Sequence, residues 1–123
     1  MNQDITFVTG YFKIEKNKYN SDYFEWMSNL LLNLDAPIVI YTTIDLFKQM
    51  MDLRKGYENK TKVILTTFEE FYVYKYLNYF KYDLMRDFER DIHNIYLYMI
   101  WNEKLNFLKK TIELNPFNTS YFA

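Results

Sequence analysis

Three short apolar runs constrain the fold of this chain more than any other feature. They span residues 5–9, 38–41 and 63–65, and they lack the polar alternation of a half-exposed strand. Such runs are typical of strands that are covered on both faces, as in a parallel sheet. Segments with helical spacing separate the runs, which favours right-handed βαβ connections. We therefore predict a single α/β domain over residues 1–123, with a Rossmann-like βαβαβ unit, a mainly parallel sheet and helices on both faces.

Two helices are predicted between these runs. Ser21 or Asp22 can cap the first helix, whose apolar residues follow the spacing of one buried helical stripe. These residues are Tyr23, Trp26, Met27, Leu30, Leu31 and Leu34. Thr43 is expected to cap the second helix, and Gly56 to supply the left-handed residue that follows its end.

Two more helices are predicted after the third run. Residues 67–70 read Thr-Phe-Glu-Glu, a capping box, so a helix should begin there and continue to about Phe88, although alternating tyrosines interrupt its pattern. The last helix should be capped by His93 and Asn94, and should end at Asn115 because the residue before a proline avoids the helical region. Its expected core positions are Leu97, Ile100, Trp101, Leu105, Leu108 and Ile112.

A single glycine, Gly10, follows the first apolar run, where phosphate-binding folds carry their glycine-rich loops. The dinucleotide fingerprint needs three glycines and the P-loop needs Gly-Lys-Ser/Thr, and neither pattern is present. A lone glycine at this place most often forms only a sharp turn. The sequence therefore predicts a turn at Gly10 and no classical NAD or ATP site.

The composition excludes several classes of protein. The formal net charge is −1, so no strong field attracts nucleic acid or an anionic membrane. With no cysteine and one histidine, a disulfide framework and a thiolate zinc site are ruled out. No apolar segment is long enough for a membrane span, so we expect a cytoplasmic protein with no membrane insertion. The 13 tyrosines and 11 phenylalanines suggest an AT-rich genome.

A charged stretch before the last helix is the one candidate metal cluster. Acidic side chains and the histidine recur there at every second position, as Asp87, Glu89, Asp91 and His93. That spacing brings side chains together only on a strand, and the neighbouring Arg86 and Arg90 favour a solvated, salt-bridged helix end. We therefore assign no metal ligand.

Two other stretches have open interpretations. The aromatic residues between positions 71 and 80 could stack on nucleic acid, but only two lysines accompany them, which favours core packing or a partner contact. Asn102 and Lys104 interrupt an otherwise apolar helix, so they either meet a polar partner or reach solvent.

Several segments together resemble the HtrL/YibB family, also called WlaTC/HtrL glycosyltransferases, which occur in bacterial surface-polysaccharide loci and some large DNA viruses. The resemblance covers nearly the whole chain, from residues 5–12 and 37–42 to the last helix and beyond. Its most specific parts are Trp-Asn-Glu-Lys at positions 101–104 and Asn-Pro-Phe at positions 115–117, followed by Tyr121 and Phe122.

The resemblance implies a GT-A type fold whose N-terminal half holds a nucleotide-sugar donor. In that family a Trp-x-Asp-x-Gly motif should follow the Tyr-Phe strand and hold Mn²⁺ or Mg²⁺ on the donor diphosphate. The present chain ends at Ala123, before that motif, so we expect a half-domain truncated before its metal site. The cation is expected for the full-length family, and this chain alone should bind none.

The resemblance also implies which residues meet the donor, expected to be a UDP-sugar. Thr9, Gly10 and Tyr11 would line the end of the first strand, and Tyr41 and Thr42 the end of the second. Trp101, Asn102 and Lys104 would face the donor from the last helix. No catalytic residue is assigned.

The leading prediction is a nucleotide-sugar-binding domain of glycan biosynthesis, inactive alone and located in the cytoplasm, or the host cytoplasm if viral. The alternative is a truncated, non-catalytic remnant that acts as a protein-interaction module and self-associates through an exposed sheet edge. A small enzyme of another type is disfavoured because no nucleophile and base form a recognisable set.

Overall fold

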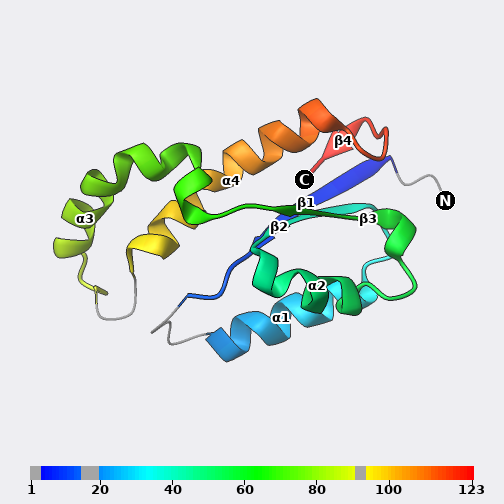
Figure 1. Ribbon diagram of the computed structural model, residues 1–123, viewed down its shortest axis with the longest axis horizontal. Helices are drawn as coiled ribbons and strands as arrows, with labels where there is room; N and C mark the ends of the chain where they lie inside the picture. The colour runs from blue at the N-terminus through cyan, green and yellow to red at the C-terminus, as the bar shows by residue number, and fades with distance from the viewer. Residues whose placement is uncertain (1–3, 15–19, 91–93) are drawn as a thin grey trace.

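The computed structural model describes residues 4–14, 20–90 and 94–123. They form one α/β unit, shown in Figure 1. The strands are β1 (Ile5–Tyr11), β2 (Ile38–Thr42), β3 (Thr61–Leu65) and β4 (Tyr121–Phe122). The α-helices are α1 (Asn20–Asn33), α2 (Phe47–Leu53), α3 (Leu77–Met85) and α4 (Ile95–Leu114). Short 3₁₀ turns are η1 (Ile44–Leu46), η2 (Glu58–Lys60), η3 (Phe68–Glu70) and η4 (Tyr72–Tyr76).

The four strands form one all-parallel sheet in the order β3-β2-β1-β4. β1 pairs with β2 from Phe7 opposite Ile38 to Tyr11 opposite Thr42, and β3 continues this register on the other side of β2. The prediction of a parallel Rossmann-like sheet with three strands is therefore confirmed. The strand-like run after the last helix adds a short fourth strand beside β1.

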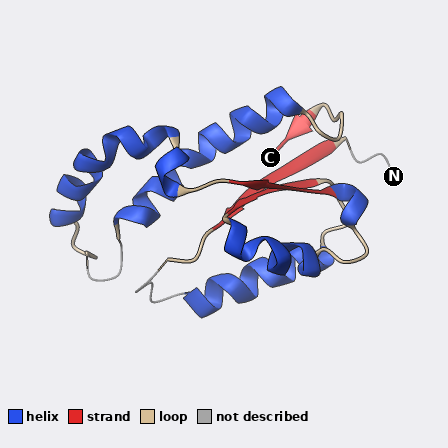
Figure 2. Cartoon of the chain, in the orientation of Figure 1, coloured by secondary structure: helices blue, strands red, loops and turns tan. Residues whose placement is uncertain are grey.

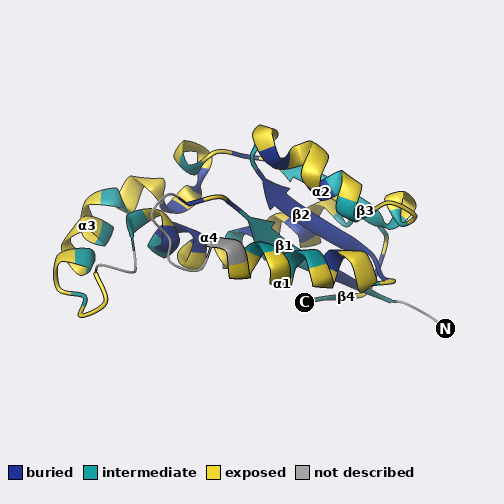
Figure 3. Ribbon diagram, turned by 90° about the horizontal axis from the view of Figure 1, so that it is seen from below, coloured by how far each residue is buried: buried dark blue, intermediate teal, exposed yellow. Residues whose placement is uncertain are grey.

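Helices cover both faces of the sheet, with α1 and α2 on one side and α4 on the other (Figures 1 and 2). Every residue of β2 is buried, as expected for a continuous apolar run in the centre of the sheet. Its side chains alternate, so that Ile38 and Ile40 join the core beneath α1, while Val39 and Tyr41 join the core beneath α4. Figure 3 shows β2 as the most enclosed strand.

The predicted long helix from residue 67 to about 88 is wrong. The chain forms η3 and η4 with an extended residue, Phe71, between them, and only then the short helix α3. The buried carboxylate of Glu103 accepts hydrogen bonds from the main-chain N–H groups of Tyr72 (2.9 Å) and Val73 (3.2 Å). These bonds and the burial of Phe71 and Val73 hold this segment in a shape that a regular helix does not allow.

The predicted helix ends are confirmed at three places and wrong at three. Ser21 and Asp22 do not cap α1, because they lie inside a helix that already begins at Asn20. Asn94 caps α4 by accepting a hydrogen bond from Leu97 N–H, whereas His93 lies outside the described residues. Asn115 ends α4 in the left-handed region at φ 39°, and Gly56 has φ 94°. Thr43 and Thr67 make no side-chain cap hydrogen bond, and each precedes a 3₁₀ turn in place of the predicted α-helix.

Candidate functional site

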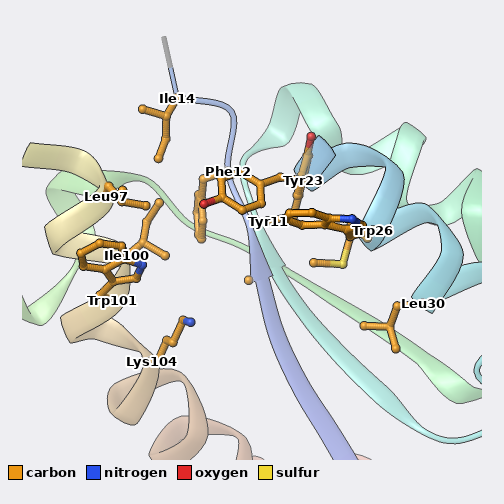
Figure 4. Close-up of a pocket in the computed structure, with 12 residues that line it drawn as sticks. Tyr11, Phe12, Ile14, Tyr23, Trp26, Leu30, Leu97, Ile100, Trp101 and Lys104 are labelled. Carbon is orange, nitrogen blue, oxygen red and sulfur yellow. The ribbon is translucent and has the colours of Figure 1, made fainter. Parts of the chain in front are cut away.

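A cavity of about 320 Å³ opens at the carboxyl end of β1, between α1 and α4. Figure 4 shows its walls, with side chains of α1 facing those of α4 across the end of the strand. Its lining residues are Gly10, Tyr11, Phe12, Ile14, Tyr23, Trp26, Met27, Leu30, Leu97, Ile100, Trp101 and Lys104. The volume is at the lower end of the range for small-molecule sites.

The position of this cavity follows from the order of the strands. From β1 the chain moves outward to β2 and β3, and it then returns past β1 to form β4 on the opposite side. Open parallel sheets bind ligands at the carboxyl edge, beside the strand where the direction of the connections reverses. In this sheet that strand is β1, so the cavity lies at the place where this class of sheet binds its ligands.

Aromatic rings from both helices dominate the walls of the cavity. Tyr23 and Trp26 of α1 meet edge to face with centroids 5.4 Å apart, and Trp101 of α4 lies opposite. Trp26 is 59% exposed and Trp101 is 44% exposed. The expected single buried stripe on α1 is therefore wrong for Tyr23, Trp26 and Leu30, which line the cavity rim while Leu31 enters the core.

The sequence also predicts a buried stripe on α4 that the structure corrects. Leu97 and Ile100 are buried, but Leu105 is 77% exposed and Ile112 is also exposed. The face that meets the sheet carries Met99, Glu103, Phe107 and Thr111 instead. On this face Glu103 accepts hydrogen bonds from main-chain N–H groups of η4, which apolar spacing alone does not reveal.

Lys104 carries the only charge among the described residues that line the cavity. Figure 4 shows its ammonium group reaching from α4 toward β1. Opposite it, Tyr11 lies at the end of β1, where burial raises the pKa of its phenol above the usual value. The cavity therefore combines planar apolar walls with one cation.

Gly10 has a different role from the turn that the sequence predicts. It lies inside β1, and of the two glycines only Gly56 has a positive φ. A Cβ atom on Gly10 would stand 3.0 Å from the ring of Phe12 and 3.1 Å from the ring of Phe107. The glycine is therefore needed for close packing of α4 against the strand beside the cavity.

Two of the predicted site residues lie away from the cavity. Tyr41 is buried, stacks on Phe107 at 4.4 Å and exchanges a hydrogen bond of 3.0 Å with Thr111. Burial raises the pKa of Tyr41, and the bond to Thr111 partly opposes this. The hydroxyl of Thr42 donates to the carbonyl of Tyr11 at 2.6 Å, so Thr42 supports the end of β1 from behind.

The remaining predicted residues divide between two places. Thr9 lines a second hollow of about 410 Å³ that shares Gly10, Met27 and Lys104 with the cavity. Asn102 is exposed, and its amide donates to the carbonyl of Tyr98 at 2.8 Å. Because residues two apart lie on different sides of a helix, Asn102 does not face the cavity with Lys104.

The described residues offer no fit for a divalent cation. They contain no group of three His, Cys, Asp or Glu side chains that could hold a metal, and no acidic residue lines the cavity. In the charged stretch, Asp87 accepts hydrogen bonds from Glu89 N–H and from the Tyr98 hydroxyl, whereas Asp91 and His93 lie outside the described residues. Burial, followed by the bond to Asp87, raises the pKa of Tyr98 to about 12.

Comparisons of the chain with protein-family models, curated proteins and solved structures found no match. The resemblance to the HtrL/YibB family therefore stays a prediction. Within the described residues, no helix is both long and apolar enough to cross a membrane.

Proposed function

We propose that this domain binds a nucleotide-sugar donor, as the donor-binding part of a glycosyltransferase-like protein of glycan biosynthesis. The observation that carries the proposal is the meeting of Gly10, Tyr11, Trp101 and Lys104 in one cavity at the strand where ligands bind in this class of sheet. These four come from segments about 90 residues apart, on which the family resemblance also rests.

The chemistry of the cavity fits a nucleotide better than a purely apolar ligand. Aromatic rings such as Trp26 and Trp101 provide stacking surfaces for a base, and stacking contributes about 1 to 3 kcal/mol per base. The Lys104 ammonium supplies a point charge for a phosphate oxygen. A UDP-sugar combines these two features, a planar base and a diphosphate.

The proposal covers binding of the donor and not transfer of the sugar. The family resemblance implies Mn²⁺ or Mg²⁺ on the diphosphate, where a cation would neutralise the leaving group. No acidic side chain among the described lining residues is placed to hold that cation, so we derive no transfer step. In this proposal the domain meets its donor in the cytoplasm, without nucleic acid or membrane insertion.

The chain contains a direct reporter of this cavity. It has two tryptophans, and both line the walls. We expect UDP-glucose to quench their fluorescence in a saturable manner, and UDP to compete with it, because a stacked base alters the surroundings of both indoles. Fluorescence that stays unchanged through millimolar UDP-glucose, together with no heat of binding in calorimetry, would contradict the proposal.

A second candidate function is that of a protein-interaction module, and the surface of α3 favours it. This helix projects from the end of the molecule opposite the N-terminus (Figure 1). Tyr79, Tyr82 and Met85 on the helix, with Phe88 just after it, are exposed. Such a group of large apolar side chains fits a partner contact. Glutamate substitutions at Tyr79 and Tyr82 would abolish a partner contact while leaving UDP-glucose binding intact.

A further inference from the structure

The helix α3 carries two stripes of side chains, and only one of them packs on the protein. Leu77, Phe80 and Leu84 are partly buried, and the first two pack against the core beneath α4. The opposite stripe is exposed, and its members follow one another at a spacing of four, three and four residues. This is the spacing of a seam between two packed helices. The members of this outer stripe are Lys75, Tyr79, Tyr82 and Arg86.

Two tyrosines form the middle of the outer stripe. Tyr79 is 70% exposed and Tyr82 is 57% exposed, and Met85 and Phe88, at and just after the end of the helix, are exposed as well. Figure 1 shows that α3 projects from the body of the molecule. Tyrosine, phenylalanine, methionine and arginine are the residue types that are enriched in protein–protein interfaces. The composition of this surface therefore favours a protein partner.

A cation stands at each end of the outer stripe. Lys75 belongs to η4 just before the helix, and its ammonium lies 3.9 Å from the centroid of the Tyr72 ring. Arg86 follows the last residue of the helix, and its guanidinium lies 5.5 Å from the centroid of the Tyr82 ring. In the described part of the chain, neither cation forms an ion pair. Both charges can therefore meet carboxylates of a partner, and the planar Arg86 group can hold one with two hydrogen bonds.

The order of the charges along the outer stripe disfavours a second copy of this chain as the partner. When two such stripes pack antiparallel with Tyr79 opposite Tyr82, Lys75 of one copy meets Arg86 of the other. When they pack parallel across a two-fold axis, each cation meets its own counterpart. Either arrangement brings like charges together, which opposes association.

The charge around the outer stripe is also too low for a nucleic acid or an anionic membrane. Between positions 72 and 90, four basic side chains stand against three acidic ones. Binding to phosphate backbones and to anionic lipids grows with each added cation. A protein partner needs only one carboxylate for each cation of the outer stripe.

We propose that the outer stripe packs against an amphipathic helix of a partner protein, in which two apolar positions lie between two carboxylates. The four positions of the partner helix repeat the spacing of four, three and four residues. Its apolar side chains then meet Tyr79 and Tyr82, while its carboxylates meet Lys75 and Arg86. This inference rests on the second candidate function, the protein-interaction module, and names the partner that such a module takes. It is independent of nucleotide binding.

The test uses the whole chain labelled with ¹⁵N and two blocked peptides that differ only in charge. The acidic peptide is acetyl-Ala-Glu-Gln-Ala-Gln-Leu-Ala-Gln-Leu-Ala-Gln-Ala-Glu-Gln-Ala-amide, and the basic peptide has lysine in place of both glutamates. We expect the acidic peptide to shift the amides of α3 saturably. The basic peptide should bind about tenfold more weakly, because two favourable ion pairs become two repulsive ones. Equal affinity would overturn the charge match but leave α3 as a protein contact, whereas no shift with either peptide at millimolar concentration would overturn both.

Two charge-reversed variants separate the outer stripe from the rest of the surface. Lys75→Glu combined with Arg86→Glu should reverse the preference, so that the basic peptide binds more tightly, and circular dichroism checks that the variant folds. Lys48→Glu combined with Lys55→Glu changes the net charge equally at exposed positions of α2 and just after it, and should keep the preference for the acidic peptide. A first variant that loses both peptides alike would overturn the proposal. Binding to phosphatidylserine vesicles, or a dimer in sedimentation, would do the same if Tyr82→Glu abolished it.

Discussion

In the described part of the chain, each face of the sheet buries one charged side chain, and the two side chains differ in what they bind. Arg54 lies under α1 and α2, and its guanidinium donates to the carbonyls of Leu31, Leu34 and Ala36 and to the hydroxyl of Thr61. Glu103 lies under α4 and accepts from the N–H groups of η4. Both charges are satisfied largely by hydrogen bonds to the main chain.

The hydrogen bonds of these two side chains show how α1 and α4, the two walls of the cavity, are held in place. Arg54 binds the carbonyls where α1 ends, so it fixes the helix that carries Trp26. Glu103 stands next to Lys104 on α4 and ties this helix to the irregular segment before α3. Arg54 thus holds the α1 wall through carbonyls 18 to 23 residues earlier in the chain, whereas Glu103 ties the α4 wall to N–H groups 30 and 31 residues earlier.

The largest expected effect is on the α1 face. Arg54→Ala leaves two buried carbonyls and one part-buried carbonyl without their donor and opens a space where a long side chain was fully buried. We expect the free energy of unfolding to fall by about 4 kcal/mol, as for a broken buried charge network. Urea denaturation measures this, and Lys55→Ala, exposed at the next position, should change it by less than about 0.5 kcal/mol.

A smaller effect is expected on the α4 face. Glu103→Ala leaves the N–H groups of Tyr72 and Val73 unsatisfied, which costs about 1 to 3 kcal/mol per buried group, reduced because the segment can relax toward solvent. We expect a loss of about 2 kcal/mol, with faster hydrogen exchange confined to η4. Glu113→Ala, at an exposed position of the same helix, is the matched control. If both variants lost the same free energy of unfolding, the hydrogen bonds from Glu103 to η4 would not stabilise the fold.

The smallest stability effect concerns the start of α4. Asn94→Ala removes the side-chain acceptor for Leu97 N–H, and N-cap losses of this kind cost about 1 kcal/mol. The cap acts within one helix, so the midpoint of thermal unfolding should fall by a few degrees. Hydrogen exchange of the amides around Arg54 and in η4 should stay unchanged. A loss as large as that of Arg54→Ala would mean that this turn holds more of the fold than its contacts show.

The sequence predicts the sheet better than the helices that cover it, for a physical reason. Apolar runs and helical spacing record burial, so they identify β1 to β3, the parallel sheet and Leu31 in the core. They do not record which main-chain groups a buried charge satisfies, so the extended residue Phe71 and the inward turn of Glu103 were missed. The sequence signal for this contact is Glu103 itself, a carboxylate within an otherwise apolar helix that needs hydrogen-bond donors if it is buried.

The candidate site divides in the same way. Gly10, Tyr11, Trp101 and Lys104 meet as expected, because strand order and helix spacing determine where they lie. Tyr41, Thr42 and Asn102 lie elsewhere, since their positions depend on side-chain direction and hydrogen bonds. The α1 aromatics Tyr23 and Trp26 were assigned to the core, as spacing alone does not separate a core stripe from a cavity wall.

The central claim is that the cavity between the two helices binds a nucleotide-sugar through Lys104. Isothermal titration with UDP-glucose tests it most directly, on the wild type, on Lys104→Ala and on Lys109→Ala, an exposed lysine of α4 outside the cavity. A hydrogen bond to a charged group contributes about 1.5 to 3 kcal/mol, so Lys104→Ala should weaken binding about ten- to a hundredfold while Lys109→Ala matches the wild type. Equal dissociation constants for the two variants, or no binding by the wild type, would contradict the account.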